Sequence, residues 1–71
     1  MKFIITSVKD DAIGYMPPMA FTNERAAKRW FQNNFKKDNP SADDYHLTSI
    51  GNFDDETGDL TTWSPERIED E

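Results

Sequence analysis

Residues 24–37 read ERAAKRWFQNNFKK, a stretch in which no residue breaks a helix and apolar side chains recur at helical spacing. Ala27, Phe31 and Phe35 recur every four residues, so on a helix they form one apolar stripe, with Trp30 beside it. Basic and polar side chains occupy the opposite side. The stretch therefore predicts an amphipathic helix whose apolar stripe packs on the rest of the domain.

Both ends of this helix carry residues that are typical of helix boundaries. Thr22 or Asn23 can cap the N-terminus with a side-chain oxygen, and Glu24 lies near the positive end of the helix dipole. Residues 38–41, DNPS, end the helix, because proline cannot continue it and disfavours helical backbone at the residue before it. We therefore expect the helix to span Glu24 to Lys37.

Two strands are expected before the helix. Residues 2–8 alternate imperfectly and are rich in β-branched and aromatic side chains, which predicts a strand. Asp10-Asp11-Ala12 predicts a turn and Ile13-Gly14-Tyr15 a second extended segment, so the two segments form a hairpin. Pro17-Pro18 removes two backbone N–H donors, which places the second strand at the sheet edge or ends it there.

Two more strands are expected after the helix. Residues 45–50 alternate and predict a third strand, which continues to residue 53 with a bulge at Gly51. Residues 55–58, DETG, predict a hairpin turn, since the glycine at its end can take positive φ. Residues 60–63 then return as the fourth strand.

The order ββαββ predicts a small α+β domain in which one amphipathic helix packs on an antiparallel sheet. The chain has 71 residues, which is the size of one domain and too short for two. We expect this single domain to span residues 1–65. Residues 66–71 are polar and mostly acidic, which predicts a flexible tail.

The composition favours a folded intracellular chain. Mean hydropathy is −0.88, but five Phe, two Trp and two Tyr supply large side chains to bury. The absence of cysteine excludes disulfides, iron–sulfur clusters and thiol catalysis, and small secreted domains usually need such cross-links. Apolar runs such as those at residues 3–5 and 30–31 are too short for a membrane span or a signal peptide.

The net charge of −6 conceals a division between the two halves of the chain. Residues 1–37 hold seven basic and three acidic side chains, whereas residues 38–71 hold eleven acidic side chains and one arginine. Such asymmetry suggests a surface for nucleic acid or another charged partner beside an acidic region.

Catalytic and metal-binding motifs are absent from the sequence. The single histidine, His46, alternates with apolar neighbours on the third strand and is expected to face solvent. The acidic turn at residues 54–59 lacks the spacing of a calcium-binding loop. We therefore expect neither an enzyme, nor a cofactor, nor a bound metal.

The polar face of the helix is the most informative candidate site. Its basic side chains could contact phosphates through charge alone, with Lys2 and Lys9 extending the stripe. Exposed aromatic side chains could add stacking for single strands, the candidates being Tyr15, Trp30 and Trp63. The alternative is an ordinary solvated helix face. The basic candidates are Arg25, Lys28, Arg29, Lys36 and Lys37.

Four segments resemble, in the same order, the small non-structural protein of gokushoviruses, which are single-stranded-DNA microviruses that infect bacteria. The likeness runs from about residue 2 to residue 65. This chain departs from the family pattern at Lys28 and Trp30, where apolar or small residues are common. The resembling segments are YMPPM at 15–19, the helix with Ala26, Ala27, Arg29 and Phe31, DDYHL at 43–47 and IGNFDDETG at 50–58.

The resemblance implies a DNA-binding role in genome replication or packaging, in the cytoplasm of an infected bacterium and outside the mature capsid. Single-stranded DNA is then the expected partner. The resemblance does not identify the residues that would contact the DNA.

Two other functions stay open on the sequence alone. The chain could be an interaction module for a phage or host protein, through the acidic turn at 54–59 or the edge at 16–21, where a homodimer could also form. It could also modulate a host factor as an acidic mimic of DNA.

Overall fold

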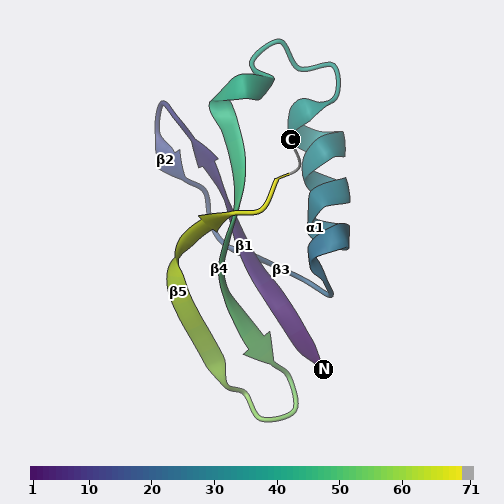
Figure 1. The fold of residues 1–71 in the computed structure, drawn as a ribbon, viewed down its shortest axis with the longest axis vertical. Helices are drawn as coiled ribbons and strands as arrows, with labels where there is room; N and C mark the ends of the chain where they lie inside the picture. Colours follow the sequence, from purple (N-terminus) through teal and green to yellow (C-terminus); the bar gives the residue numbers. More distant parts are fainter. Residues whose placement is uncertain (70–71) are drawn as a thin grey trace.

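Five β-strands and one α-helix follow one another along residues 1–69, the part of the chain that the computed structural model describes (Figure 1). The α+β class, with one helix on an antiparallel sheet, is confirmed. The structure has one strand more than predicted, the short β3 before the helix. The elements are β1 (Lys2–Asp10), β2 (Gly14–Tyr15), β3 (Met19–Phe21), α1 (Glu24–Phe31), the π-helical turn η1 (Gln32–Lys36), the 3-10 turn η2 (Ala42–Asp44), β4 (Tyr45–Asp54) and β5 (Leu60–Arg67).

The sheet has the order β2-β1-β4-β5, and β3 pairs with β1 further along the same edge as β2. All of these pairings are antiparallel. The predicted effect of Pro17-Pro18 is confirmed, because the edge strand is interrupted there and resumes as β3. The two hairpins thus pair through their first strands, β1 and β4, in the middle of the sheet.

The core lies between α1 and the centre of the sheet. Val8 of β1 lies opposite Leu47 of β4, and both pack against Ala27 and Phe31 of the helix. These four side chains are at most 4% exposed. The predicted apolar stripe is therefore confirmed. Figure 1 shows α1 along one side of the sheet, and no second α-helix in residues 1–69 covers the other side.

The helix ends earlier as a regular α-helix than the sequence predicts. Asn23 is the N-cap, since its side chain accepts a hydrogen bond of 2.8 Å from the Ala26 backbone N–H. α1 then ends at Phe31, and the chain continues as the wider turn η1. The Asn34 side chain donates to the Trp30 carbonyl oxygen at 2.8 Å, and so competes with the regular backbone ladder at this point.

The predicted bulge of the third strand lies one residue earlier than expected. Ile5 pairs with Gly51 and the next residue of β1 pairs with Ser49, so Ile50 has no partner on β1. The pairing of β4 with β5 shifts at the same place. Gly51 is required there, because a Cβ would collide with the Thr61 carbonyl oxygen.

The fourth strand is longer than predicted. β5 continues to Arg67, so residues assigned to the flexible tail belong to the sheet. The Ile68 N–H donates to the Leu47 carbonyl oxygen at 3.0 Å, and the Ile68 side chain packs against the core. Contacts with β4 therefore hold residues 66–68, which the polar sequence had assigned to the tail. The last two tail residues, 70 and 71, lie outside the described residues.

Candidate nucleic-acid interface

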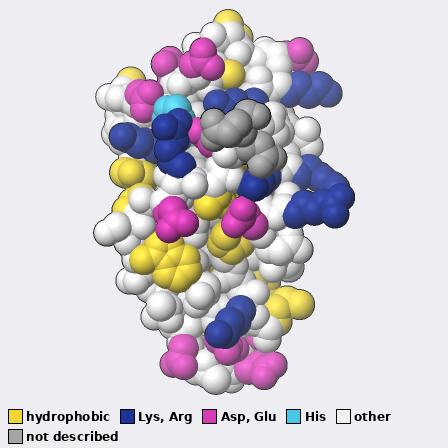
Figure 2. Space-filling view, in the orientation of Figure 1, with side chains coloured by type: hydrophobic (Ala, Val, Ile, Leu, Met, Phe, Trp, Pro, Cys, Tyr) yellow, Lys and Arg dark blue, Asp and Glu magenta, His cyan; other side chains and the backbone are white. Residues whose placement is uncertain are grey.

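Three of the predicted basic residues lie together on α1. Lys28 and Arg29 lie three and four positions after Arg25, and the three line one shallow hollow with Glu24 and Gln32. We call these three basic residues the basic helix face. Figure 2 shows Lys and Arg side chains on the side of α1, while Asp and Glu side chains gather at both ends of the molecule, one of which is formed by the β4–β5 hairpin. The amphipathic packing of the helix orients this face, because its opposite side is buried in the core.

The cations of the basic helix face differ in their partners. Lys28 Nζ lies 3.1 Å from a Glu24 carboxylate oxygen, one helical turn away. Arg25 and Arg29 are exposed, and within residues 1–69 neither guanidinium group takes part in an ion pair. The two arginines can therefore accept an external anion without losing an ion pair within residues 1–69.

Lys36 lies elsewhere, although the sequence placed it on the same stripe. Its Nζ donates to the Ala42 carbonyl oxygen at 2.8 Å and lies 4.0 Å from a carboxylate oxygen of Glu69. It also lies 5.4 Å from the centre of the Phe31 ring. Lys36 therefore stabilises the turn after the helix. Lys37 is exposed beyond the end of η1 and does not line the hollow.

The aromatic candidates lie apart from the basic helix face. Trp30 is half-buried, and its ring centre lies 5.5 Å from that of Phe21 and 5.4 Å from that of Phe35. It belongs to the packing under the helix. Tyr15 and Trp63 line a hollow of their own and are 52% and 40% exposed. Neither exposed ring lines the hollow of the basic helix face.

Lys9 does not extend the basic helix face. It pairs with Tyr15 across β1 and β2, and its Nζ lies 5.9 Å from the centre of the tyrosine ring. Lys9 alternates with Val8, which faces α1, so its side chain lies on the opposite side of the sheet. The alternation of side chains along β1 is the sequence signal that could have predicted this placement of Lys9.

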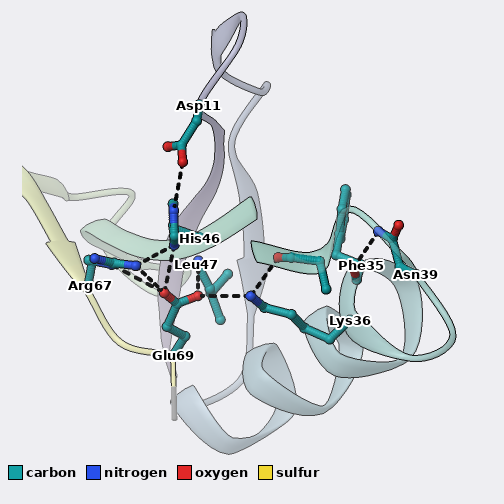
Figure 3. A network of polar contacts seen from close by, with 9 residues as sticks. Asp11, Phe35, Lys36, Asn39, His46, Leu47, Arg67 and Glu69 are labelled. Atoms are coloured by element: carbon teal, nitrogen blue, oxygen red, sulfur yellow. Dashed lines mark hydrogen bonds and ion pairs between the residues drawn. The ribbon is translucent and has the colours of Figure 1, made fainter. Parts of the chain in front are cut away.

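His46 is not a solvent-facing histidine. Its side chain is 17% exposed, and its Nδ1 and Nε2 atoms lie 2.9 Å from Glu69 and 3.2 Å from Asp11 respectively (Figure 3). When protonated, the imidazole donates to both carboxylates. Arg67 donates to the same Glu69 oxygen at 2.7 Å, and the Leu47 backbone N–H donates to the other at 3.3 Å. This cluster attaches the end of the described chain to β4.

The Glu69 carboxylate is ionised more readily than a free glutamate. Its burial acts to raise its pKa, but hydrogen bonds from His46, Arg67 and the Leu47 backbone outweigh burial and lower the pKa below the ordinary value of 4.5. The charged form is therefore the one that the fold stabilises.

The acidic turn between β4 and β5 is an ordinary hairpin connection. Gly58 has φ of 78°, as the sequence predicts, and Asp54 Oδ1 accepts a hydrogen bond of 2.9 Å from the Glu56 N–H. Among residues 1–69, no group of three histidine or acidic side chains is arranged to hold a metal ion. Nor does the described chain contain a helix of the length and apolar character needed to cross a bilayer.

Comparison with known proteins gives one match. The family model described as Phage ORF5 protein matches residues 3–71, which is nearly the whole chain. No curated protein and no solved structure matches the chain significantly.

Proposed function

The chain belongs to the Phage ORF5 protein family, and from this premise we propose that it is a bacteriophage accessory protein that binds single-stranded DNA. The binding serves genome replication or packaging in the cytoplasm of the infected bacterium, and the protein is not a component of the mature capsid. The role is one of binding and not of catalysis.

The observation that carries this proposal is the pair of arginines on the basic helix face. Arg25 and Arg29 are exposed, lie one helical turn apart and form no ion pair in the described chain. Guanidinium groups donate in a planar fork that fits phosphate oxygens. Such contacts are independent of base sequence, because they reach only the backbone of the nucleic acid.

The number of arginines sets the expected salt dependence. Each phosphate contact on a single strand contributes about −0.7 to the slope of log K against log salt. Contacts from Arg25 and Arg29 therefore give a slope of about −1.4, which is a loss of about sevenfold in affinity from about 50 to about 200 mM salt. The net charge of −6 keeps the overall affinity modest.

Fluorescence anisotropy of labelled single-stranded and duplex oligonucleotides at these two salt concentrations tests the proposal. Arg25→Glu and Arg29→Glu should weaken binding of every sequence and flatten the salt dependence. Lys37→Glu is the matched control, because it makes the same change of charge at an exposed site outside the hollow. No binding by the unmodified protein at low salt, or equal losses in all three variants, would contradict the proposal.

A second candidate function is a protein-interaction module, and the edge of the sheet favours it. All eight residues of β5 are exposed, and β5 pairs with a neighbour on one side only. An exposed edge strand can pair with a strand of another chain, including a second copy. Sedimentation equilibrium tests the homodimer: a monomer at all concentrations would exclude it.

A further inference from the structure

The face of the sheet that points away from α1 has a composition unlike the rest of the chain. It is defined by Phe3, Ile5, Ser7 and Lys9 of β1, which alternate with the residues facing the helix, and by their partners across the strands. We call it the open sheet face. Directly paired residues share a face, so the register assigns the side chains of the neighbouring strands.

The charged side chains of the open sheet face are all basic types. Lys9 pairs with His46. Two residues along β1, Ser7 pairs with Thr48, which in turn pairs with Arg67 of β5. The acidic residues of the described strands have partners on the helix side. Asp10 pairs with Tyr45 and Gly14, Asp54 with Lys2, and Glu66 with Ser49.

Two carboxylates approach this face from outside the strands. Asp11 and Glu69 contact His46, and Glu69 also contacts Arg67, at one end of the sheet. Lys9 forms no ion pair among the described residues. Lys9 can therefore accept an external phosphate without losing an ion pair within residues 1–69.

Two half-exposed aromatic rings, Tyr15 and Trp63, are held in place by the fold, and Tyr15 lies beneath Lys9. Tyr15 and Trp63 line one hollow with Ile50 and Pro18, and Trp63 also borders a second hollow with Glu24 and Glu66. The Trp63 indole N–H donates to the Ser49 carbonyl oxygen at 3.1 Å, which fixes the ring against β4. Tyr15 is fixed by its place in the β1–β2 hairpin, under the ammonium group of Lys9. Half-exposed rings fixed in this way lose little conformational freedom when a ligand stacks on them.

We propose that the open sheet face binds unpaired nucleobases of single-stranded DNA, which stack on Tyr15 and Trp63 while Lys9 contacts an adjacent phosphate. The inference rests on the proposed function and adds a second surface to it. Aromatic rings on a sheet stack on bases of any sequence, and each base has two faces to offer. Duplex DNA fits poorly, because its bases are already stacked on one another.

Charge favours a nucleic acid over a second copy as the occupant. A second copy docked face to face would bring a second Lys9, which forms no ion pair among residues 1–69, whereas a nucleic acid brings a phosphate. A single strand of DNA supplies both a phosphate for Lys9 and base rings for the hollow that Tyr15 and Trp63 line.

The test measures the affinity for an oligothymidylate and for a duplex of equal length. Tyr15→Leu and Trp63→Leu should each weaken binding of the single strand about tenfold or more, and leave duplex binding within twofold. Tyr15→Phe and Trp63→Phe keep a ring and should retain most of the affinity. Ile13→Ala is the matched control, since Ile13 is 78% exposed and does not line the hollow.

A spectroscopic measurement checks stacking directly. Trp30→Phe leaves Trp63 as the single tryptophan, and a ring at position 30 preserves the packing with Phe21 and Phe35. Single-stranded DNA should quench the Trp63 emission in this variant, and the quenching should saturate together with the anisotropy.

The outcomes separate this inference from the proposed function. If the leucine variants bind the single strand as tightly as the unmodified protein while Arg25→Glu does not, the open sheet face is not the base-binding surface and the proposed function stands. If the unmodified protein binds no single strand, both fail. A change of Trp63 emission with protein concentration alone, without DNA, would overturn the inference in favour of a second copy.

Discussion

Replacing Glu69 by glutamine tests the cluster that attaches the end of β5 to β4. Glu69→Gln keeps the shape of the side chain and one oxygen acceptor but removes the charge. The carboxylate receives hydrogen bonds or ion pairs from His46, Arg67 and the Leu47 backbone. The side chain is 11% exposed, so water screens these contacts only in part.

The magnitude follows from the two contacts with cationic side chains. A hydrogen bond that involves a charged group contributes about 1.5–3 kcal/mol, and a neutral one about 0.5–1.5 kcal/mol. The loss of charge at the contacts with His46 and Arg67 should therefore lower the free energy of unfolding by about 2 kcal/mol at neutral pH. A domain of this size has a total stability of about 4–10 kcal/mol, so the change is easily measured.

The pH dependence gives the sharper check. Because the folded-state pKa of Glu69 is lowered below its ordinary value of 4.5, the stabilisation is fully present above that value and is lost as pH falls through the folded pKa. Urea unfolding followed by tryptophan fluorescence, in steps from about pH 7 to about pH 3, should show the unmodified protein and Glu69→Gln converging in acid.

A matched control for this experiment is Asp11→Asn. Asp11 contacts the other nitrogen of His46, but its side chain is 49% exposed, so its effect should be well below that of Glu69→Gln. A difference between the unmodified protein and Glu69→Gln that stays constant down to about pH 3 would refute the role of the Glu69 charge.

Four further substitutions test the fold. Phe31→Ala removes a fully buried ring and should cost about 3–5 kcal/mol, a large part of the total stability, measured as a lower urea midpoint. Asn23→Ala removes the side-chain cap of α1 and should lower the free energy of unfolding by about 1 kcal/mol. Thr22→Ala is its control, because that substitution leaves the cap in place. Gly51→Ala forces a Cβ against the Thr61 carbonyl oxygen, and should perturb the amide resonances of β4 and β5 more than those of α1. Gly58→Ala strains a positive φ of 78° and should cost about 1 kcal/mol by thermal unfolding, a loss that Gly58→Asn should reduce.

The local features of this fold could be predicted from the sequence. The apolar stripe through Ala27 and Phe31 and the cap at Asn23 depend on spacing within one helix, and the structure contains both. The interruption at Pro17-Pro18 depends on missing N–H donors and is equally local. Each of these signals lies within a few residues of the feature that it predicts.

The features that the sequence did not predict depend on contacts between distant segments. His46 is covered because Glu69 and Asp11 reach it, and they lie 23 and 35 positions away along the chain. Lys36 leaves the basic stripe because the turn η1 is wide and its Nζ meets Ala42 and Glu69. Helical spacing could not reveal that turn.

The separation of the two candidate surfaces has the same origin. Whether Tyr15 lies on the side of Arg25 or on the other side follows from the register between β1 and β2, and a shift of one residue would reverse it. The sequence predicted both Tyr15 and Arg25 as candidates, but not that the sheet lies between them.

The central position of β1 affects how the chain folds. Its longest pairing is with β4, and the hydrogen bond from Thr48 to the Ser7 carbonyl oxygen joins residues 41 positions apart. The sheet therefore cannot close until the chain has formed a long loop that contains the helix, and loops of this length slow folding more than they reduce stability. On the ribosome, β1 must wait without its main partner until residues 45–54 have emerged, with only the short strands β2 and β3 to cover one edge. The split edge strand thus has a second consequence, because β2 and β3 can shield β1 during synthesis.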